Sequence, residues 1–418
     1  MKNKNMEKEH EIKTVVPALR FPEFTNMGNW KIEILSNISS RVFDGIHQTP
    51  KYVNEGIPFY SVENIVSNKN NKYISEEDYL LYSSTNKVEK GDILISRIGT
   101  IGKSVVVNWD YRFYIYVTLA AVKKTNKFNS YFLSSFFQSE FYQKEILSKS
   151  LLNAVPCKIN MEELRRTRIL LPETREQQKI ADCLSSFDDL IEATNRKIEV
   201  LKEHKKGLMQ RLFPKEGKNV PELRFPEFQE TKGWAKKQII DLGEVITGNT
   251  PSKKEGKYWN GDFAWITAQD FKGKYINDSI LKLTRFGKNK ARVIPQNSVL
   301  VTCIASIGLN AINKIECSTN QQINTICCNR KYHYEYVYYL ITYNVKRLKQ
   351  LAGQTAVPII TKKNFEEFEV YTVENYDEQQ KIADCLSSLD ELIEATSQKV
   401  EILKEHKKGL MQQLFPKI

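Results

Sequence analysis

The chain contains the same 40-residue segment twice, and this repeat constrains its architecture more than any other feature. Residues 176–215 and 378–417 differ at only seven positions. A second repeated block precedes each of them, at 17–24 and 221–228, where the two copies differ at one position. The long segments between these blocks are only faintly alike. The sequence therefore predicts two copies of one fold, with unlike surfaces, joined by two copies of one spacer.

The repeated segment has the period of a coiled coil. In each copy the seam positions advance in alternating steps of four and three residues, and no proline interrupts them, which predicts a left-handed coiled coil. The polar seam positions Thr194 and Lys205, with Thr396 and Lys407 in the second copy, are candidates for fixing the register. The apolar seam residues are Ile180, Leu184, Phe187, Ile191, Ile198, Leu201, Leu208 and Leu212, then Ile382, Leu386, Leu389, Ile393, Val400, Leu403, Leu410 and Leu414.

Because one chain supplies two such seams, we expect the two helices to pair with each other. With the two large domains at opposite ends, this pairing is antiparallel. The alternative is that each helix pairs with a partner protein. The predicted domains are an N-terminal tail at 1–16, a large domain at 17–175, a helix at 176–215, a second large domain at 216–377 and a second helix at 378–418.

Each large domain combines short β-like runs with turn signals and one helical stretch. The fold class is therefore α+β, with two globular domains in tandem, each followed by a long helix. In the first domain we expect strands over 92–96, 104–108 and 113–118 and a helix over 131–147. In the second we expect strands over 299–303 and 322–327 and a helix over 334–348.

Almost all of the net charge of +12 is carried by the two domains, and residues 1–16 add +1. The helices are almost neutral, at +1 for 176–215 and −1 for 378–418, whereas residues 17–175 carry +5 and residues 216–377 carry +6. If the basicity serves to bind a polyanion, the domains therefore bind it. No apolar run reaches the roughly 18–20 residues of a membrane span, and no export signal is present. The seven cysteines include no C-x-x-C pair, so we expect a cytoplasmic protein with reduced thiols and no metal site.

Polar loops rich in glycine are the candidate recognition segments. Their side chains are of the types that read base edges and bind phosphates in DNA, although such residues also populate ordinary solvated turns. The candidates are Arg41, His47, Gln48, Thr49, Lys51, Arg97 and Thr100 in the first domain, and Asn249, Thr250, Ser252, Lys253, Lys254, Asn320, Gln321, Gln354 and Thr355 in the second.

No catalytic motif is present, and one segment imitates a phosphate-binding loop. Residues 97–104 end in Gly102-Lys103-Ser104, but Arg97 stands where the motif requires its first glycine, and the other repeat has no lysine at the corresponding place. A strand–turn–strand hairpin is the better interpretation. We assign no catalytic residue to this chain. The alternative hypothesis that the chain is an NTP-dependent enzyme has no support other than this segment.

The layout resembles the DNA-specificity subunit of type I restriction–modification enzymes. The resemblance rests on the helix opening Glu-Gln-Gln-Lys-Ile-Ala at 176–181 and 378–383, and on Leu-Arg-Phe-Pro-Glu-Phe at 19–24 and 223–228. It implies a non-catalytic subunit whose two target-recognition domains each read half of a bipartite, asymmetric sequence in double-stranded DNA, with the helices fixing the spacing.

The resemblance also implies partners. Two methylation subunits, which bind S-adenosylmethionine, dock on the specificity subunit, and restriction subunits add ATP/Mg chemistry in the full complex. No cofactor is expected on this chain itself. The alternative function is a coiled-coil interaction scaffold with ligand-binding end domains and no DNA role.

Overall fold

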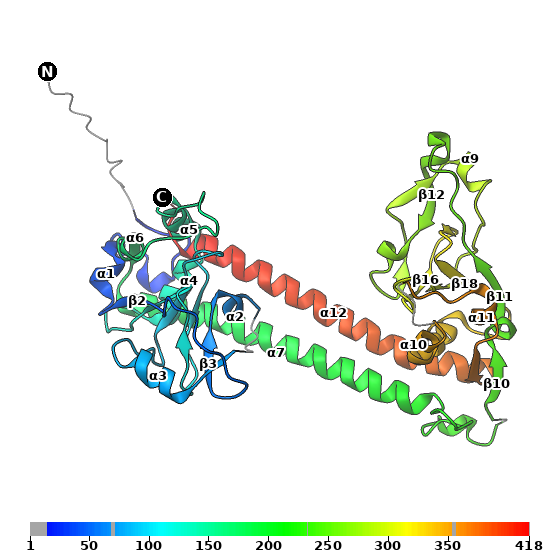
Figure 1. Cartoon of the computed structure of the whole chain (residues 1–418). Helices are drawn as coiled ribbons and strands as arrows, with labels where there is room; N and C mark the ends of the chain where they lie inside the picture. Colours follow the sequence, from blue (N-terminus) through cyan, green and yellow to red (C-terminus); the bar gives the residue numbers. More distant parts are fainter. Residues whose placement is uncertain (1–14, 68–71, 232, 353–356, 418) are drawn as a thin grey trace. The chain divides into compact units, whose positions relative to one another are not determined.

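The computed structural model describes residues 15–67, 72–231, 233–352 and 357–417, and the chain divides into two compact units. Unit 1 comprises residues up to Asn195 and those from Gln398 onward, and unit 2 comprises Arg196–Ser397. Each unit therefore holds one large domain, the first half of the helix that follows it and the second half of the other helix (Figure 1).

The two repeated segments form helices of 39 residues each, α7 (Thr174–Leu212) and α12 (Tyr376–Leu414). In unit 1, Ile180 and Leu184 near the start of α7 share a hydrophobic core with Leu414 at the end of α12. Unit 2 repeats this contact with the roles of the helices exchanged. The predicted antiparallel coiled coil is therefore confirmed. All the seam positions named above are buried or half-buried.

An aromatic residue just beyond each helix anchors it to a domain. In unit 1 the ring of Phe415 lies 5.7 Å from that of Phe132 and meets Trp30 edge-on at 6.3 Å. Phe213 makes the same kind of contact in unit 2, where it meets Trp234 edge-on at 5.9 Å. Each domain is thus packed against the end of the helix that follows the other domain in the sequence.

A buried ion pair joins the two repeated blocks in each unit. The guanidinium of Arg20 donates two hydrogen bonds of 2.7 Å to the carboxylate of Glu176, which is fully buried. Arg224 and Glu378 repeat this arrangement in unit 2, at 2.8 and 2.7 Å, and the hydrogen bonds from Glu378 raise the pKa of Arg224. Bidentate pairs of this kind fix both distance and orientation. In each unit, the short repeated block and the repeated helix are therefore parts of one structural element.

The domain in unit 1 is built on a four-stranded antiparallel sheet with the order β2–β8–β5–β6 and a three-stranded sheet with the order β4–β3–β7, in which β3 and β7 are parallel. A third pair, β1 with β9, is antiparallel. The bounds are β1 Lys31–Ile34, β2 Val42–Asp44, β3 Ile57–Tyr60, β4 Tyr73–Ile74, β5 Ile93–Ser96, β6 Ser104–Val106, β7 Tyr114–Ile115, β8 Leu119–Val122 and β9 Arg168–Leu171. The helices are α1 Leu35–Ile38, α2 Val62–Ser67, α3 Glu76–Ser83, α4 Ser130–Phe137, α5 Glu140–Ser148 and α6 Met161–Arg165.

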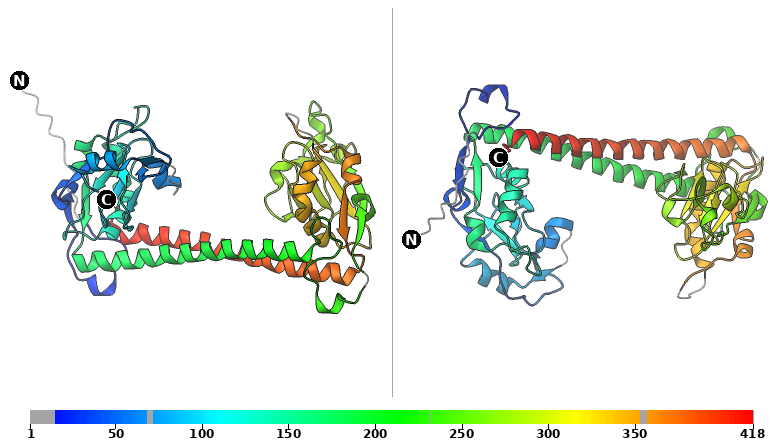
Figure 2. Two further views of the ribbon diagram at one scale, coloured as in Figure 1. Left: turned by 60° about the horizontal axis from the view of Figure 1, so that its bottom comes forward. Right: turned by 90° about the horizontal axis from the view of Figure 1, so that it is seen from above.

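Unit 2 has the same plan with one more strand in its larger sheet, whose order is β11–β18–β15–β16–β13, and a smaller sheet β14–β12–β17 with parallel β12 and β17 (Figure 2). Strand β10 pairs with β19. The bounds are β10 Ala235–Gln238, β11 Gly243–Thr247, β12 Trp259–Ile266, β13 Tyr275–Ile276, β14 Leu281–Leu283, β15 Val299–Thr302, β16 Asn310–Asn313, β17 Ser318–Thr319, β18 Ile323–Cys328 and β19 Glu369–Thr372. The helices are α8 Ile239–Leu242, α9 Arg285–Lys288, α10 Tyr334–Gln350 and α11 Lys362–Glu366.

The central strand of each domain is apolar on both faces because each face covers a separate core. In β5, Ile93 and Ile95 belong to the core that reaches the helices, while Leu94 points into the core on the other side of the sheet. The alternation follows from the two-residue period of a strand. None of the helices in the described ranges combines the length and the apolar character that crossing a bilayer requires.

The expected helix over 131–147 is two helices in the structure. Ser139 starts the second one, because its hydroxyl accepts a hydrogen bond from the N–H of Tyr142 at 3.3 Å. An N-cap serine of this kind ends one helix and begins another. Unit 2 has no such break, and its helix α10 is continuous, as predicted.

Candidate nucleic-acid interface

Four segments of the domain in unit 1 are joined by backbone hydrogen bonds. The loop 45–51 exchanges hydrogen bonds with residues 115–118, in both directions through Ile46. Residues 115–118 are also bonded to Tyr60, at the end of β3, and to Arg97, at the end of β5. The candidate recognition residues of this domain therefore belong to one connected group of loops. The exception is Arg41, which precedes β2 in the sequence, whereas the loop 45–51 follows it.

Unit 2 builds the same group from the corresponding segments. The loop 248–254 is bonded to residues 319–322 through the N–H of Asn249, which donates to Thr319 O at 2.9 Å. Residues 319–322 are bonded in turn to Ile266 and Cys303, which correspond to Tyr60 and Arg97. The two domains therefore share a backbone frame in these loops and differ in the side chains attached to it.

Arg97 has a structural role, because it connects segments of the first domain. Its guanidinium is buried and donates to Asp44 Oδ2 at 2.8 Å, to Val117 O at 3.1 Å and to Ile159 O at 3.2 Å. Burial lowers the pKa of Arg97, and the charge of Asp44 opposes this effect; an arginine stays protonated at neutral pH in either case. Because the side chain is buried and its Nε and Nη1 donors are engaged, Arg97 holds four segments together, and the structure does not present it for reading bases.

The other predicted residues of unit 1 are exposed. His47 Nε2 lies 3.0 Å from Asp44 Oδ2, and Thr49 Oγ1 lies 3.3 Å from the hydroxyl of Tyr116. Arg41 is exposed and donates to Thr85 O at 2.9 Å. Among the predicted residues of unit 1, those whose side chains form no hydrogen bond or ion pair within the described residues are Gln48, Lys51 and Thr100. These three are the free groups of this surface.

Asn249 in unit 2 bridges two segments, as Arg97 does in unit 1. Its Nδ2 donates to Lys290 O at 2.8 Å, and its Oδ1 accepts from the N–H of Arg292 at 2.7 Å. Its own carbonyl accepts from Trp265 Nε1 at 3.1 Å. Both ends of the amide are used, so Asn249 also positions the loop.

The remaining predicted residues of unit 2 fall into three groups. Thr250 and Gln321 are hydrogen-bonded to each other at 2.6 Å, and Asn320 Nδ2 donates to Gln322 at 3.1 Å. Ser252, Lys253 and Lys254 are exposed. Gln354 and Thr355 lie outside the described residues.

The segment that imitates a phosphate-binding loop uses its own donors. It is a hairpin between β5 and β6, as predicted. The N–H of Gly102 donates to Ser96 O at 2.9 Å, that of Lys103 to Ser96 Oγ at 2.9 Å, and that of Gly99 to Cys157 O at 2.8 Å. A phosphate-binding loop needs such N–H groups for its ligand. The geometry therefore argues against a nucleotide site.

Sequence reasoning missed an aromatic cluster in unit 1. The hydroxyl groups of Tyr60 and Tyr111 are 2.6 Å apart, and the ring of Trp109 is stacked on that of Tyr111 at 5.8 Å. Burial, followed by the bond to Tyr111, raises the pKa of Tyr60. Tyr111 itself is 53% exposed. The sequence signal for this cluster was the density of aromatic residues in 109–116. Aromatic residues are also common in strands, so this density alone did not indicate an exposed cluster.

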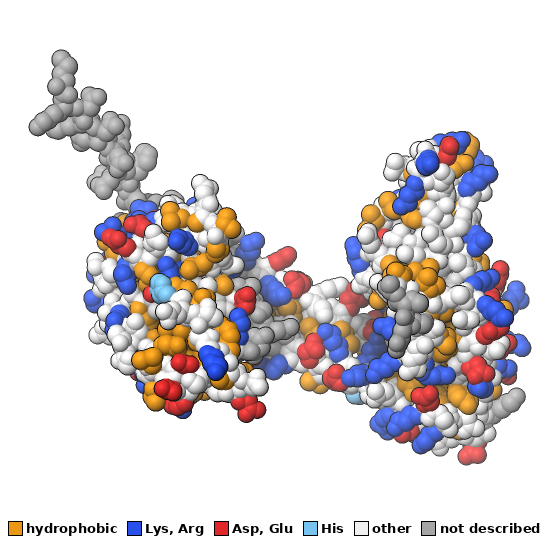
Figure 3. All heavy atoms as spheres, in the orientation of Figure 1, with side chains coloured by type: hydrophobic (Ala, Val, Ile, Leu, Met, Phe, Trp, Pro, Cys, Tyr) orange, Lys and Arg blue, Asp and Glu red, His pale blue; other side chains and the backbone are white. Residues whose placement is uncertain are grey.

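Sequence reasoning also missed an arm in unit 2 that is formed by β12, β14 and α9. Figure 3 shows Lys and Arg side chains at the end of the unit that carries α9, next to an exposed hydrophobic group. The signal in the sequence was the basic character of residues 252–292, which contain ten Lys or Arg and four Asp or Glu.

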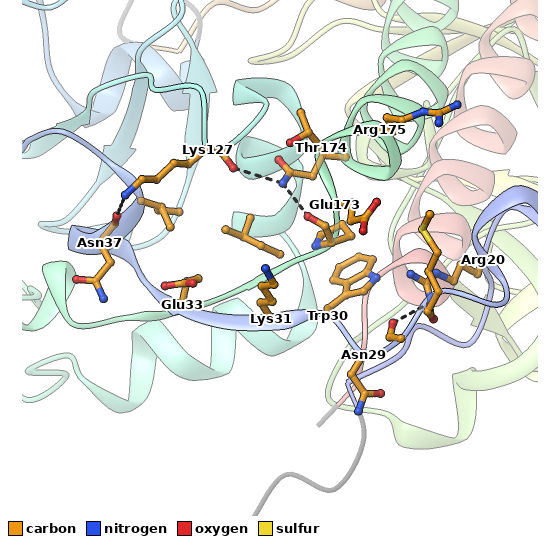
Figure 4. A pocket seen from close by; sticks show the side chains of 16 residues that line it. Arg20, Asn29, Trp30, Lys31, Glu33, Asn37, Lys127, Glu173, Thr174 and Arg175 are labelled. Atoms are coloured by element: carbon orange, nitrogen blue, oxygen red, sulfur yellow. Dashed lines mark hydrogen bonds between the residues drawn. The ribbon is translucent and has the colours of Figure 1, made fainter.

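A cavity of about 640 Å³ lies in unit 1, where the start of α7 meets the β1 region. Figure 4 shows Trp30, Lys31 and Glu173 among the side chains that line it. The corresponding hollow in unit 2, at Thr231 and Asn375, is about 130 Å³. Because the repeat does not preserve its volume, this cavity gives no support for a ligand common to both copies.

Comparison with known proteins agrees with this architecture. The description "type I restriction modification DNA specificity domain" belongs to a family model that matches residues 45–203 and 231–405. The type I restriction enzyme MjaIX specificity subunit of Methanocaldococcus jannaschii is 35% identical over 192 residues, which are 43% of this chain and 44% of that protein. The chain thus matches less than half of the length of this first relative.

Two further similarities extend over nearly the whole chain. The putative MjaX specificity subunit of the same organism is 26% identical over 408 residues, which are 93% of each protein. The crystal structure of a type I restriction–modification S subunit from M. genitalium covers 96% of this chain and 100% of its own, with a TM-score of 0.60 and 16% identity, and therefore shares the fold. Since the family model covers most of the residues and both domains, this chain belongs to the type I restriction–modification DNA-specificity family.

Proposed function

We propose that each large domain reads one half of a bipartite, asymmetric DNA sequence. The observation that carries the proposal is that equivalent loops have one backbone frame and different chemistry. In unit 1 the ion pair of Asp44 and Arg97 holds the frame. In unit 2 the equivalent positions are Thr247 and Cys303, and Thr247 donates to Asn324 Oδ1 at 2.6 Å. Two unlike surfaces on one frame suit two unlike half-sites.

The charge distribution supports DNA as the ligand. Residues 17–175 and 216–377 carry net charges of +5 and +6, whereas the helices are nearly neutral. Basic surfaces release counterions when they bind DNA, so binding should weaken steeply as the salt concentration rises. The residues that we propose as DNA contacts are the half-buried Thr250 and the exposed Gln48, Thr49, Lys51, Thr100, Ser252, Lys253, Lys254 and Gln321.

The test is an exchange of one domain. Residues 30–175 are replaced by the corresponding segment of another family member, and methylated adenines are mapped in a host that also makes the partner subunits. We expect one half of the methylated sequence to change and the other half to stay. A change in both halves, or in neither, would contradict the assignment of one half to each domain.

We further propose that the helices set the spacing of the half-sites and that methylation subunits dock on them. Exposed side chains do not contribute to the seam, yet they are largely identical in α7 and α12, for example Lys206 and Lys408. The domains diverged while these surfaces did not. Two identical surfaces suit two copies of one partner, which would bring S-adenosylmethionine, while restriction subunits would bring ATP and Mg²⁺. This chain would then supply specificity and no catalytic group.

A pair of variants tests the docking. K206E/K408E changes an exposed position that is identical in both helices. V200A/I402A changes an exposed position that differs between them, where Val200 is 67% and Ile402 is 52% exposed. We expect K206E/K408E to lose co-purification with the methylation subunit and V200A/I402A to keep it. Equal behaviour of the two variants would count against docking on the repeated surface.

A further inference from the structure

The side chain of Phe286 is exposed at the end of an arm in unit 2. It lies in the single turn α9, which follows β14 at the end of the arm (Figure 1), and 68% of its surface is accessible. Its neighbours Arg285 and Lys288 are basic. An exposed phenyl ring among cations calls for a ligand that offers both an apolar surface and negative charge.

The turn that carries Phe286 is held firmly. A Cβ atom on Gly287 would lie 2.1 Å from Tyr258 O, so the backbone packs there without any space for a side chain. The N–H of Gly287 donates to Thr284 Oγ1 at 3.2 Å, and this hydroxyl donates to Lys257 O at 2.6 Å. The turn is therefore held by its contacts with the backbone of residues 257 and 258, while Phe286 stays exposed to solvent.

The arm is bonded directly to the candidate recognition loop. Asn249 in that loop accepts from the N–H of Arg292 and donates to Lys290 O, as described above. The guanidinium of Arg292 also donates to Thr247 O at 2.7 Å. The segment that follows α9 and the loop 248–254 thus form one continuous element.

The cations around this element are partly unpaired. Lys257 pairs with Glu255 at 3.3 Å, and Lys288 pairs with Glu316. Within the described residues, the exposed cations of this element whose side chains form no hydrogen bond or ion pair are Lys253, Lys254, Arg285 and Lys290. Unpaired cations on a recognition surface are the groups that bind phosphates.

We propose that Phe286 inserts between two base pairs beside the half-site read by the second domain, while these cations bind the neighbouring phosphates. This inference rests on the proposed DNA-reading function. Phosphates satisfy the cations, and the faces of the bases offer the ring the largest apolar surface of the duplex. Apolar wedges flanked by basic residues open and kink base steps in this way. The second domain would then also select DNA that is easily deformed.

The corresponding turn of the first domain is acidic and does not suit such a wedge. Helix α3 follows β4 as α9 follows β14, and it also exposes large apolar side chains, Leu80 at 58% and Leu81 at 67%. However, its first turn contains three acidic residues, 76–78, which repel phosphates. L80A/L81A is therefore a matched control for F286A.

The experiment uses the full chain assembled with its methylation subunits. The target duplex is the sequence that this complex methylates in its host, and 2-aminopurine replaces single bases in and around the second half-site, excluding the adenine to be methylated. We expect the wild-type complex to raise the fluorescence at one step. F286A should abolish this rise and weaken DNA binding about tenfold, as the loss of one aromatic–base contact does. L80A/L81A should leave both unchanged.

The outcomes separate this inference from the proposed function. If the wild-type complex does not prefer its target to a scrambled duplex, the proposed function fails. If it prefers the target but shows no rise at any position, or a rise that F286A retains, the insertion alone is refuted. If F286A loses the methylation subunit in the absence of DNA, Phe286 contacts protein, and this also refutes the insertion. Because the ring is exposed, F286A should melt at the wild-type temperature, which confirms that it is folded.

Discussion

Lys205 on α7 pairs with Asp390 on α12, with 2.5 Å between Nζ and Oδ1. Lys407 and Asp188 are the equivalent residues of the other unit, and their Nζ and Oδ1 atoms are also 2.5 Å apart. The two pairs differ in burial, because Asp390 is 27% exposed and also accepts a hydrogen bond from Tyr339 at 2.6 Å, whereas Asp188 is 61% exposed. The lysines are the polar seam positions that the heptad pattern singled out.

This difference predicts unequal effects of the same substitution. K205E places a carboxylate against the half-buried Asp390, and we expect the free energy of unfolding to fall by about 3 kcal/mol. K407E faces an exposed carboxylate that can turn into solvent, and should cost less than about 1 kcal/mol. Thermal unfolding of the two variants measures both effects.

The charge-swapped double variant K205E/D390K is the control. It should recover part of the loss, because opposite charges face each other again, but not all of it, because Tyr339 loses its acceptor. Equal losses for K205E and K407E would show that burial does not govern these pairs.

A second prediction concerns the ion pair of Asp44 and Arg97. R97M removes the buried cation that pairs with Asp44 and leaves two backbone carbonyls without a donor, and should destabilise the first domain by about 3–5 kcal/mol. T100A, at an exposed position of the same hairpin, should stay within about 0.5 kcal/mol of wild type. Hydrogen exchange of residues 45–51 should accelerate in R97M and not in T100A. Unchanged exchange in R97M would contradict the positioning role.

A third prediction separates phosphate contacts from loop positioning in unit 2. K253A/K254A should reduce the slope of log K against log salt concentration by up to about 2, because each phosphate contact contributes about 0.9, and should leave the preferred sequence unchanged. N249A should keep the slope and weaken binding to the target, because it releases the loop. Fluorescence anisotropy between about 50 and 200 mM salt measures both. Identical effects of the two variants would refute the distinction.

The helices were predictable from the sequence because their contacts recur at fixed spacing. A seam such as Ile180, Leu184 and Leu212 follows from the heptad alone. The pairing of the helices with each other followed from the presence of two equal seams in one chain, and the antiparallel orientation followed from the expectation that the two large domains lie at opposite ends. The break at Ser139 was not predictable, because a serine within a helical pattern is compatible with either a cap or an exposed position.

The roles of Arg97 and Asn249 could not be predicted either. Their residue types are those that read bases, and the sequence places them in polar loops. What decides their role is the position of partners distant in the sequence, such as Ile159 for Arg97 and Lys290 for Asn249. Such contacts have no periodic signature. Residue type therefore pointed to the loops that we propose as the recognition surface, but it did not distinguish the residues that position these loops from those with free side chains.

A fourth prediction follows from His333, the buried residue that precedes α10. Its Nδ1 atom has no partner among the described residues and its side chain does not cap the helix, whereas the equivalent Asn129 of unit 1 accepts hydrogen bonds from two N–H groups of α4. H333N should therefore add a cap worth about 1 kcal/mol.

The gain from H333N should grow as the pH falls. Burial lowers the pKa of His333 below 6.5, so the unfolded chain takes up a proton there before the folded chain does. The free energy of unfolding of the wild type accordingly decreases as the pH falls through about 6.5. H333N lacks this titrating group, so its free energy of unfolding does not decrease for this reason. Melting temperatures at about pH 7.5 and 5.5 measure the difference, with H204N, at an exposed histidine, as the control. A constant difference between H333N and wild type would contradict it.

The last prediction tests the spacing role of the helices. Seven residues inserted after Asn195 and again after Ser397 lengthen both helices while keeping the antiparallel seam in register, because each insertion is one heptad. Each helix grows by about 10 Å at 1.5 Å per residue, which equals about three base pairs of DNA at 3.4 Å each. We expect the methylated sites to keep both half-sequences and to gain about three base pairs between them. An insertion in α7 alone misaligns the seam and should lower stability without defining a new spacing. Mapping of methylated adenines provides the measurement, and an unchanged spacer in the doubly inserted chain would refute the role of the helices.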